Sequence, residues 1–220
     1  MLTPLMWTLA VAGAALAAGG WQRAHLFLGV VPDTTPGAPP AYRPARFSVE
    51  VVTGLLLAGL AVAVPSAGVW AAFGWLAVCA VPLALVDVAV FRLPDRLTAA
   101  AYAGTLGLLA VTAVAERRHD ELAGALLGGL AVSAFYLVLF LVNPAGMGLG
   151  DVKLGAALGT ALGWLGWASV VAGVFAAHLA AGLYGLAMIV TRRGSRKSDL
   201  PFGPFMILGT LAAIFTGGPW

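Results

Sequence analysis

Long apolar stretches dominate this chain, and charged residues and Pro/Gly clusters divide it into about eight of them. They lie near residues 4–19, 48–65, 68–90, 98–115, 122–142, 152–164, 166–191 and 203–218. A helix that crosses a bilayer needs about 20 apolar residues, and fewer when it is partly buried in protein. The pattern predicts an all-α, polytopic transmembrane helix bundle of about eight spans, folded as a single membrane-embedded domain over residues 1–220.

Two boundaries in this pattern need a decision. The apolar run from Leu154 to Val190 is too long for one helix, and the segment from Gly163 to Gly166 predicts a tight turn within it. The stretch 4–19 has no positively charged residues before it and many spans after it, so we interpret it as a first transmembrane helix rather than a signal peptide. Residues 20–47 are rich in proline and predict a loop without a compact domain.

Composition supports lipid as the solvent for most of the chain. Hydrophobic residues make up 61% and charged residues 10%, whereas about a quarter of an ordinary globular chain is charged. The net charge of +3 comes from too few residues to build a basic surface for nucleic acid. The lone Cys79 lies in an apolar run, which predicts a small buried hydrophobe and excludes an intrachain disulfide.

The basic residues predict an orientation. If the amino terminus is outside and the spans alternate, the outer loops contain only Arg117 and Arg118. The inner loops then contain Arg23, Arg43, Arg46, Arg92, Arg96, Lys153, Arg192, Arg193, Arg196 and Lys197. Lys and Arg accumulate in cytoplasmic loops, so we expect both termini outside and residues 20–47 in the cytoplasm.

Three acidic residues lie at the ends of predicted spans rather than in loops. They are Glu50, Asp87 and Asp151, and the predicted topology places all three near the inner face. A carboxylate at membrane depth costs several kcal/mol unless it is paired or faces water, so such residues are candidates for function.

Asp87 and Asp151 each have a structural alternative. Asp87 precedes Pro94, which ends the helix, and could simply reach outward or pair with Arg92. Asp151 follows a glycine-rich segment that includes Gly148 and Gly150; irregular backbone of this kind is tolerated in membranes where it is buried in protein or lines a cavity. The alternative for Asp151 is a plain N-cap.

Together the two aspartates predict more than either does alone. Two carboxyl groups that converge on one water molecule can share a proton, so that one activates the water and the other polarises a carbonyl. This chemistry hydrolyses a peptide bond without a metal or other cofactor. We expect no metal site, because His25, His119 and His178 fall at different depths; His178 is either hydrogen-bonded within the bundle or a functional polar group.

The segments around these aspartates resemble the type IV prepilin leader peptidases, which are GxGD-type intramembrane aspartyl proteases. Gly148–Lys153 (GLGDVK) is similar to the G-x-G-D-x-K signature, and the segment from Asp87 to Thr98 is similar to D-x(5)-LPD-x-LT. The resemblance implies that Asp87 and Asp151 are catalytic. It implies that Gly148 and Gly150 let the loop approach the substrate backbone.

Other residues of these motifs have less definite roles. Lys153 pairs with Asp151 or with substrate, or only marks the inner side. Pro94 and Asp95 belong to the first motif, and we expect Asp95 to be an exposed, structural loop residue. Two weaker matches follow the family order: Arg46–Leu60, which includes Glu50, and Pro201–Gly209, which begins with Pro201, Phe202, Gly203 and Pro204.

The resemblance also sets the expected function. It implies cleavage of the basic leader from prepilin or pseudopilin precursors at the cytoplasmic face of a bacterial inner membrane. Bifunctional members carry two CxxC pairs in an inner loop and also methylate the new amino terminus; this loop is short and has no cysteine here, so we expect peptidase activity alone.

Two other classes remain as alternatives. One is a proton-coupled transporter that uses intramembrane carboxylates, which the lack of an inverted repeat and the position of both aspartates at one face disfavour. The other is a nonenzymatic assembly subunit, which the presence of both aspartates disfavours.

Overall fold

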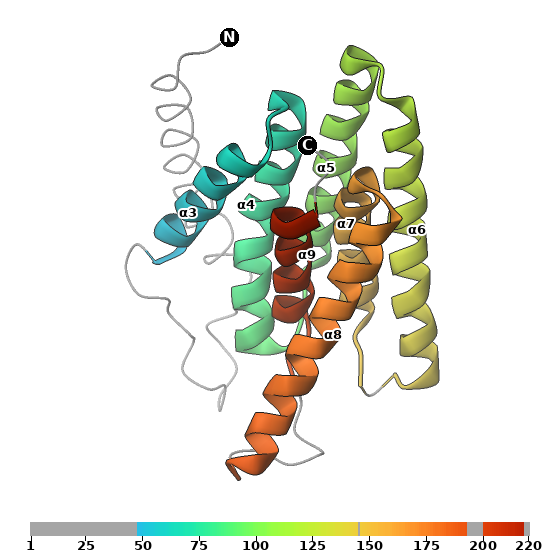
Figure 1. Cartoon of the computed structure of the whole chain (residues 1–220). Coiled ribbons are helices and arrows are strands. Elements are labelled where there is room, and N and C mark those ends of the chain that lie inside the picture. The colour runs from blue at the N-terminus through green and yellow to red at the C-terminus, as the bar shows by residue number, and fades with distance from the viewer. Residues whose placement is uncertain (1–47, 145, 193–199, 218–220) are drawn as a thin grey trace.

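The computed structural model describes residues 48–144, 146–192 and 200–217, and these form seven helices and no strand. The predicted first span (4–19) and the proline-rich loop (20–47) lie outside the described residues. The helices, shown in Figure 1, are α3 (Ser48–Ala63), α4 (Ala67–Val90), α5 (Asp95–Glu116), α6 (His119–Val142), α7 (Leu149–Leu165), α8 (Trp167–Val190) and α9 (Gly203–Gly217). They follow the predicted stretches closely, and the all-α prediction is confirmed.

Four of these helices, α4, α5, α6 and α8, are long and apolar enough to cross a membrane. Helices α3 and α9 are apolar but shorter. Large apolar side chains such as Leu130, Val171 and Phe175 are exposed on α6 and α8, which suits a surface that faces lipid. The prediction of a membrane protein is therefore confirmed, and the count of eight spans stays a prediction.

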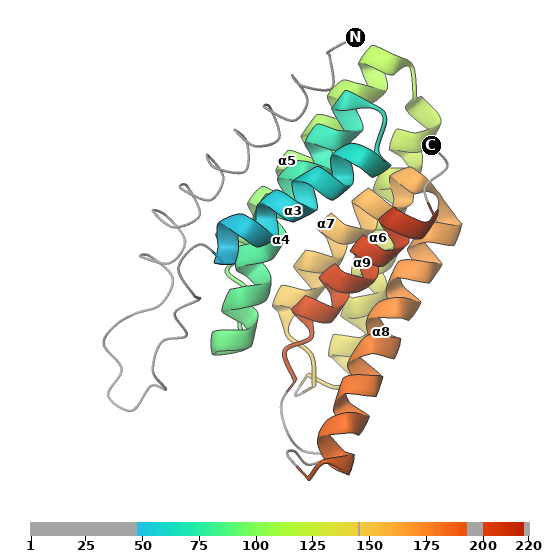
Figure 2. The same ribbon diagram turned by 60° about the vertical axis from the view of Figure 1, so that its left-hand side comes forward.

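Helix α7 lies at the centre of the bundle. It packs against α5, α6, α8 and α9, and Figures 1 and 2 show it surrounded by these neighbours. From Leu154 to Leu165 nearly every residue of the helix is buried. The helix that begins with the GLGD segment is thus the most enclosed of the described helices, which fixes the position of Asp151 from several sides.

Helices α6 and α7 meet along a glycine seam that consists of Gly124, Gly128, Gly159 and Gly163. A Cβ atom added at Gly128 would lie 2.6 Å from the carbonyl oxygen of Gly159, closer than real Cβ contacts allow. Glycines spaced four residues apart let two helix backbones approach closely, and such contacts drive helix association in lipid.

The turn between α7 and α8 lies within the predicted segment. Gly166 separates the helices with φ 109° and ψ 169°, a conformation that residues with a Cβ atom rarely adopt. Its N–H donates to the carbonyl of Gly163 at 3.1 Å. The predicted break of the long apolar run is therefore confirmed.

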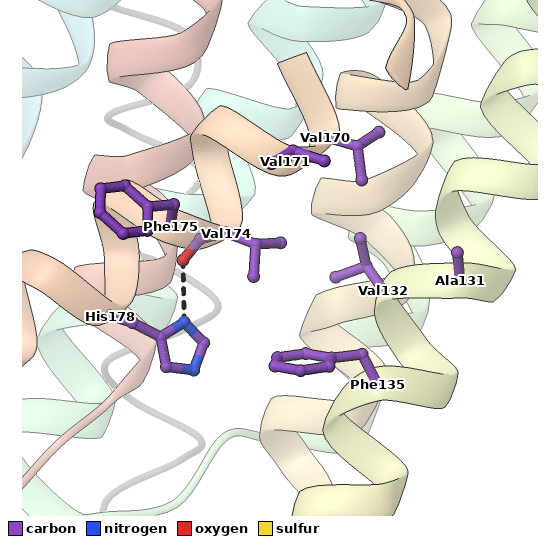
Figure 3. Close-up of a pocket in the computed structure, with 8 residues that line it drawn as sticks. All are labelled: Ala131, Val132, Phe135, Val170, Val171, Val174, Phe175 and His178. Atoms are coloured by element: carbon purple, nitrogen blue, oxygen red, sulfur yellow. Dashed lines mark hydrogen bonds between the residues drawn. The ribbon is translucent and has the colours of Figure 1, made fainter. Parts of the chain in front are cut away.

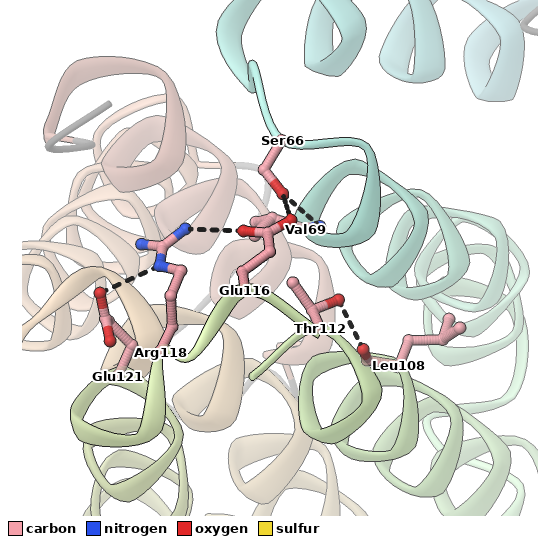
Figure 4. A network of polar contacts seen from close by, with 7 residues as sticks. All are labelled: Ser66, Val69, Leu108, Thr112, Glu116, Arg118 and Glu121. Carbon is pink, nitrogen blue, oxygen red and sulfur yellow. Dashed lines mark hydrogen bonds and ion pairs between the residues drawn. The ribbon is translucent and has the colours of Figure 1, made fainter. Parts of the chain in front are cut away.

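A polar network closes the end of the bundle that contains the α5–α6 turn (Figure 4). The hydroxyl of Ser66 donates to Glu116 at 2.7 Å, and the guanidinium of Arg118 donates to Glu121 at 3.0 Å and lies 5.0 Å from the ring centroid of Trp164. This Arg118 network (Ser66, Glu116, Arg118 and Glu121) joins α4, α5 and α6, and the ring contact adds α7.

Candidate active site

Asp87 lies on α4, three residues before the helix ends, with a side chain that is 5% exposed. Its Oδ2 atom accepts a hydrogen bond of 2.9 Å from the backbone N–H of Gly203. Gly203 begins α9, where backbone N–H groups have no partner within their own helix. Asp87 therefore points into the bundle, and the structure does not support the alternative that it reaches outward.

Gly203 has a steric reason to be glycine. A Cβ atom at this position would lie 2.9 Å from Oδ2 of Asp87, so a larger residue would displace the carboxylate. Phe202, the preceding residue, lies in the Pro201–Gly209 segment, which is one of the two weaker matches to the family. The structure thus places the Pro201–Pro204 segment directly at the first aspartate.

Asp151 is the third residue of α7, and its side chain is 8% exposed. One carboxylate oxygen accepts a 3.0 Å hydrogen bond from the backbone N–H of Gly148. The N-cap residue itself is Gly148, so the interpretation of Asp151 as a plain N-cap is wrong. The carboxylate folds back on the first turn, where the helix dipole favours a negative charge.

The two aspartates are brought together by the packing of α4, α7 and α9 against one another. The two carboxyl groups lie close enough to influence each other electrostatically, and both side chains are buried. Each carboxylate lies at the amino-terminal end of a helix, Asp151 at α7 and Asp87 at α9, and each accepts a backbone N–H there. The site therefore holds two fixed, nearly dry carboxyl groups at one end of the bundle.

The connection between α4 and α5 also touches the GLGD segment. Phe91 ends α4 in the left-handed region, with φ 52°, and its N–H donates to the carbonyl of Asp87 at 2.8 Å. Leu93 then packs on Gly150, where an added Cβ atom would lie 2.8 Å from the Cβ of Leu93. Gly150 was predicted to let the loop approach substrate; in the structure, its lack of a side chain lets α7 approach the first motif.

Lys153 does not pair with Asp151. Its ammonium group lies 2.6 Å from Asp95, and the two side chains are 48% and 74% exposed. Residues two apart on a helix point in different directions, so Lys153 faces away from Asp151 and reaches the start of α5. Asp95 is exposed as predicted, but it is the first residue of α5 and not a loop residue; Pro94 is the N-cap of that helix.

Glu50 lies in the first turn of α3 and is partly buried. Helix α3 packs against α4 and α9, the two helices that supply Asp87 and Gly203. The structure thus places Glu50 on a neighbouring helix, and its role in the site stays a prediction.

An aromatic cluster beside the aspartates was not predicted from the sequence. It consists of Phe135, Tyr136, His178 and Phe202. Tyr136 stacks on His178 with ring centroids 5.8 Å apart and planes 8° from parallel, and it interacts electrostatically with Asp151. His178 lies 5.1 Å from Phe202, centroid to centroid. The only sequence signals were single polar groups, a tyrosine and a histidine, inside apolar runs.

His178 is hydrogen-bonded within the bundle, which was one of the two alternatives that the sequence left open for it. Its Nδ1 atom lies 2.8 Å from the carbonyl oxygen of Val174, and since a carbonyl only accepts, the ring nitrogen donates. The same ring also lines a groove of about 390 Å³ between α6 and α8 (Figure 3). The other lining residues are Ala131, Val132, Phe135, Val170, Val171, Val174 and Phe175.

Comparison with known proteins decides the family. Residues 70–186, more than half of the chain and inclusive of both aspartates, match the model of the type IV leader peptidase family. The chain belongs to this family. The leader peptidase match thus contains Asp87, Asp151 and all eight groove residues, while Glu50 and the Pro201–Pro204 segment lie beyond it.

Curated relatives agree with this assignment. The chain is 37% identical over 183 residues to a prepilin leader peptidase/N-methyltransferase of Burkholderia pseudomallei, with 78% of this chain and 55% of the relative covered. It is 32% identical to one from Aeromonas hydrophila (77% and 57% covered) and 36% identical to leader peptidase HopD of Salmonella typhimurium (61% and 84% covered). The chain spans about half the length of the first two relatives. No solved structure matches it.

Proposed function

We propose that this member of the leader peptidase family is an aspartic endopeptidase that removes the basic leader from type IV pilin-like or pseudopilin precursors. The observation that carries the proposal is the pair of buried carboxyl groups, Asp87 and Asp151, each held by a backbone N–H at a helix start. The relatives named above, which are prepilin leader peptidases and a leader peptidase, support the substrate class. We assign no methyltransferase activity and no cofactor to the chain.

The chemistry follows from two carboxyl groups that share one proton. The ionised carboxylate takes a proton from a water molecule while the oxygen of that water attacks the scissile carbonyl carbon. The protonated carboxyl group of the pair donates its proton to the carbonyl oxygen. Collapse of the tetrahedral intermediate breaks the C–N bond, and the leaving amine takes a proton from the pair. The hydrogen bonds from Gly203 and Gly148 fix the two carboxyl groups before substrate arrives, so little reorganisation is needed during the reaction.

The proposed setting is a bacterial inner membrane, with the site toward the cytoplasm. Successive helices alternate between the Asp87 end and the end closed by the Arg118 network, which supports eight alternating spans in one domain with both termini outside. The distribution of Lys and Arg supports this orientation. The basic leader of the precursor would then stay on the cytoplasmic side while its apolar helix lies in lipid.

The test is cleavage of a co-expressed prepilin-type precursor in membranes that contain wild type, Asp87→Asn or Asp151→Asn. Asparagine keeps the shape of the side chain but cannot exchange the proton, so we expect each variant to lose at least about 10²-fold in cleavage rate. Asp95→Asn, which changes an exposed motif aspartate by the same substitution, is the matched control and should cleave normally. Cleavage that survives in both buried variants would show that the assignment of the pair is wrong.

A further inference from the structure

We propose that the groove between α6 and α8 is the docking site for the apolar helix of the precursor, which it holds so that the peptide bond ahead of that helix meets Asp87 and Asp151. The proposal rests on the proposed leader peptidase function and adds the surface that recognises the substrate. Helices α6 and α8 are the least buried of the four candidate spans among the described residues, and the groove residues Val171 and Phe175 are exposed. A membrane-embedded helix can therefore reach it laterally.

The lining of the groove suits an apolar helix. Seven of its eight residues are apolar, and the eighth, His178, already donates its Nδ1 hydrogen to Val174. The groove has a volume of about 390 Å³. Helices that lie in apolar grooves use side chains spaced three and four residues apart as anchors.

The groove is continuous with the candidate active site through the aromatic cluster. Phe135 and His178 line the groove and lie 5.6 Å apart, centroid to centroid. His178 in turn contacts Phe202 at 5.1 Å, and the residue after Phe202 holds Asp87. Tyr136 stacks on His178 and interacts with Asp151. A helix seated against Phe135 and His178 therefore ends beside the groups that hold both carboxylates.

The direction of the helices supports a substrate rather than a lipid chain as the occupant. Both α6 and α8 run from the Arg118 end toward the Asp87 end, and Figure 1 shows α8 leaning away from α6 along this course. The groove between them therefore points along the bundle toward the end where the scissile bond must lie. An acyl chain needs apolar surface only, whereas the line of contacts from the groove to both carboxyl groups matters only for an occupant with a bond to be cleaved.

The first experiment places a photo-crosslinking amino acid at position 171 or at position 111 in full-length protein that carries Asp151→Asn and is co-expressed with a prepilin-type precursor. Val171 lies on the groove and is 67% exposed; Val111 lies on α5, away from the groove, and is 69% exposed. We expect a crosslink to the precursor at 171 and none above background at 111. Crosslinks to lipid alone at 171, or equal crosslinks at both positions, would overturn the proposal.

The second experiment uses the cleavage assay with Val171→Trp and Val111→Trp in otherwise wild-type protein. We expect Val171→Trp to slow cleavage of the whole precursor roughly tenfold or more, because it occupies part of an apolar site, and Val111→Trp to have no effect. An equal rate in both variants would count against the groove. Failure of the wild type to cleave any precursor would instead remove the proposed function, so the two failures are distinguishable.

Discussion

Helix α6 contacts α5, α7 and α8, and it meets the last two in opposite ways. Toward α7 it presents Gly124 and Gly128, and the backbones lie so close that no Cβ atom fits between them. Toward α8 it presents Val132 and Phe135, and the two helices leave a groove of about 390 Å³. One side of the same helix is thus closed and the other is open.

The difference teaches what each interface contributes. Lipid is as apolar as a leucine side chain, so helices in a bilayer associate through close packing rather than through burial of apolar surface. The glycine seam supplies that packing and fixes α7, which carries Asp151. The interface between α6 and α8 lacks such close packing. The groove that remains there is the place where, in our proposal, the helix of the precursor binds.

The largest effect should come from breaking the closed side. In Gly128→Leu, the new side chain would meet the carbonyl oxygen of Gly159 and the backbone of Gly163. Backbone cannot move aside as a flexible side chain does, so we expect a loss of about 3 kcal/mol or more in the free energy of unfolding. Unfolding of the purified protein in mixed detergent micelles measures it.

The matched control for this change is Gly107→Leu on α5. No atom lies within 4 Å of a Cβ atom at Gly107, so the free energy of unfolding of this variant should be at least as high as that of wild type. If the two leucine variants were equally stable, the seam would not be the rigid side of α6.

A smaller effect should follow from Gly203→Ala. This variant tests whether the close contact between residue 203 and Asp87 affects cleavage, as the close contacts of the glycine seam affect stability. The added methyl group would press on the carboxylate of Asp87 and weaken the bond from the N–H of residue 203. Misplacement of a catalytic group by about 1 Å can cost about 10²-fold in rate. We expect a loss approaching that size in precursor cleavage, with little change in unfolding.

Gly182→Ala is the control for Gly203→Ala, because no atom lies near Gly182 on α8. It should leave cleavage unchanged. A normal rate in Gly203→Ala would show that the hydrogen bond from α9 does not position Asp87.

The smallest effect should come from Lys153→Ala, which lies outside both interfaces. The pair with Asp95 is largely exposed, and exposed ion pairs contribute about 0–1 kcal/mol. We expect a change in unfolding free energy within that range, reduced further by salt, and nearly normal cleavage. A loss comparable to that of Asp151→Asn would instead give Lys153 a direct role at the site.

Much of the helix pattern could be predicted because this chain marks its helix ends with charges, prolines and glycines. Gly166 is an example: it was placed within the predicted turn by its position in an overlong apolar run. The choice of Asp87 and Asp151 as candidate functional residues could also be made from the sequence, since a carboxylate at membrane depth is rarely accidental.

The contacts around these residues could not be predicted, because they depend on how each helix is rotated about its axis. The partner of Lys153 shows this: the sequence left Asp151, the substrate or no partner as alternatives, but the helical direction of the side chain gives Asp95. The link from Gly203 to Asp87 and the stacking of Tyr136 on His178 likewise join segments far apart in the sequence. No single segment of the chain contains information about them.

The bond between Gly203 and Asp87 spans 116 positions of the chain. A ribosome makes α4 long before α9, so a growing chain that has already inserted Asp87 and Asp151 still lacks the N–H that holds the first carboxylate. Under the proposed function, the first carboxylate is fixed for hydrolysis only after α9 has been synthesised and docked. The proposed peptidase would thus assemble among other nascent membrane proteins with a reduced ability to cut them.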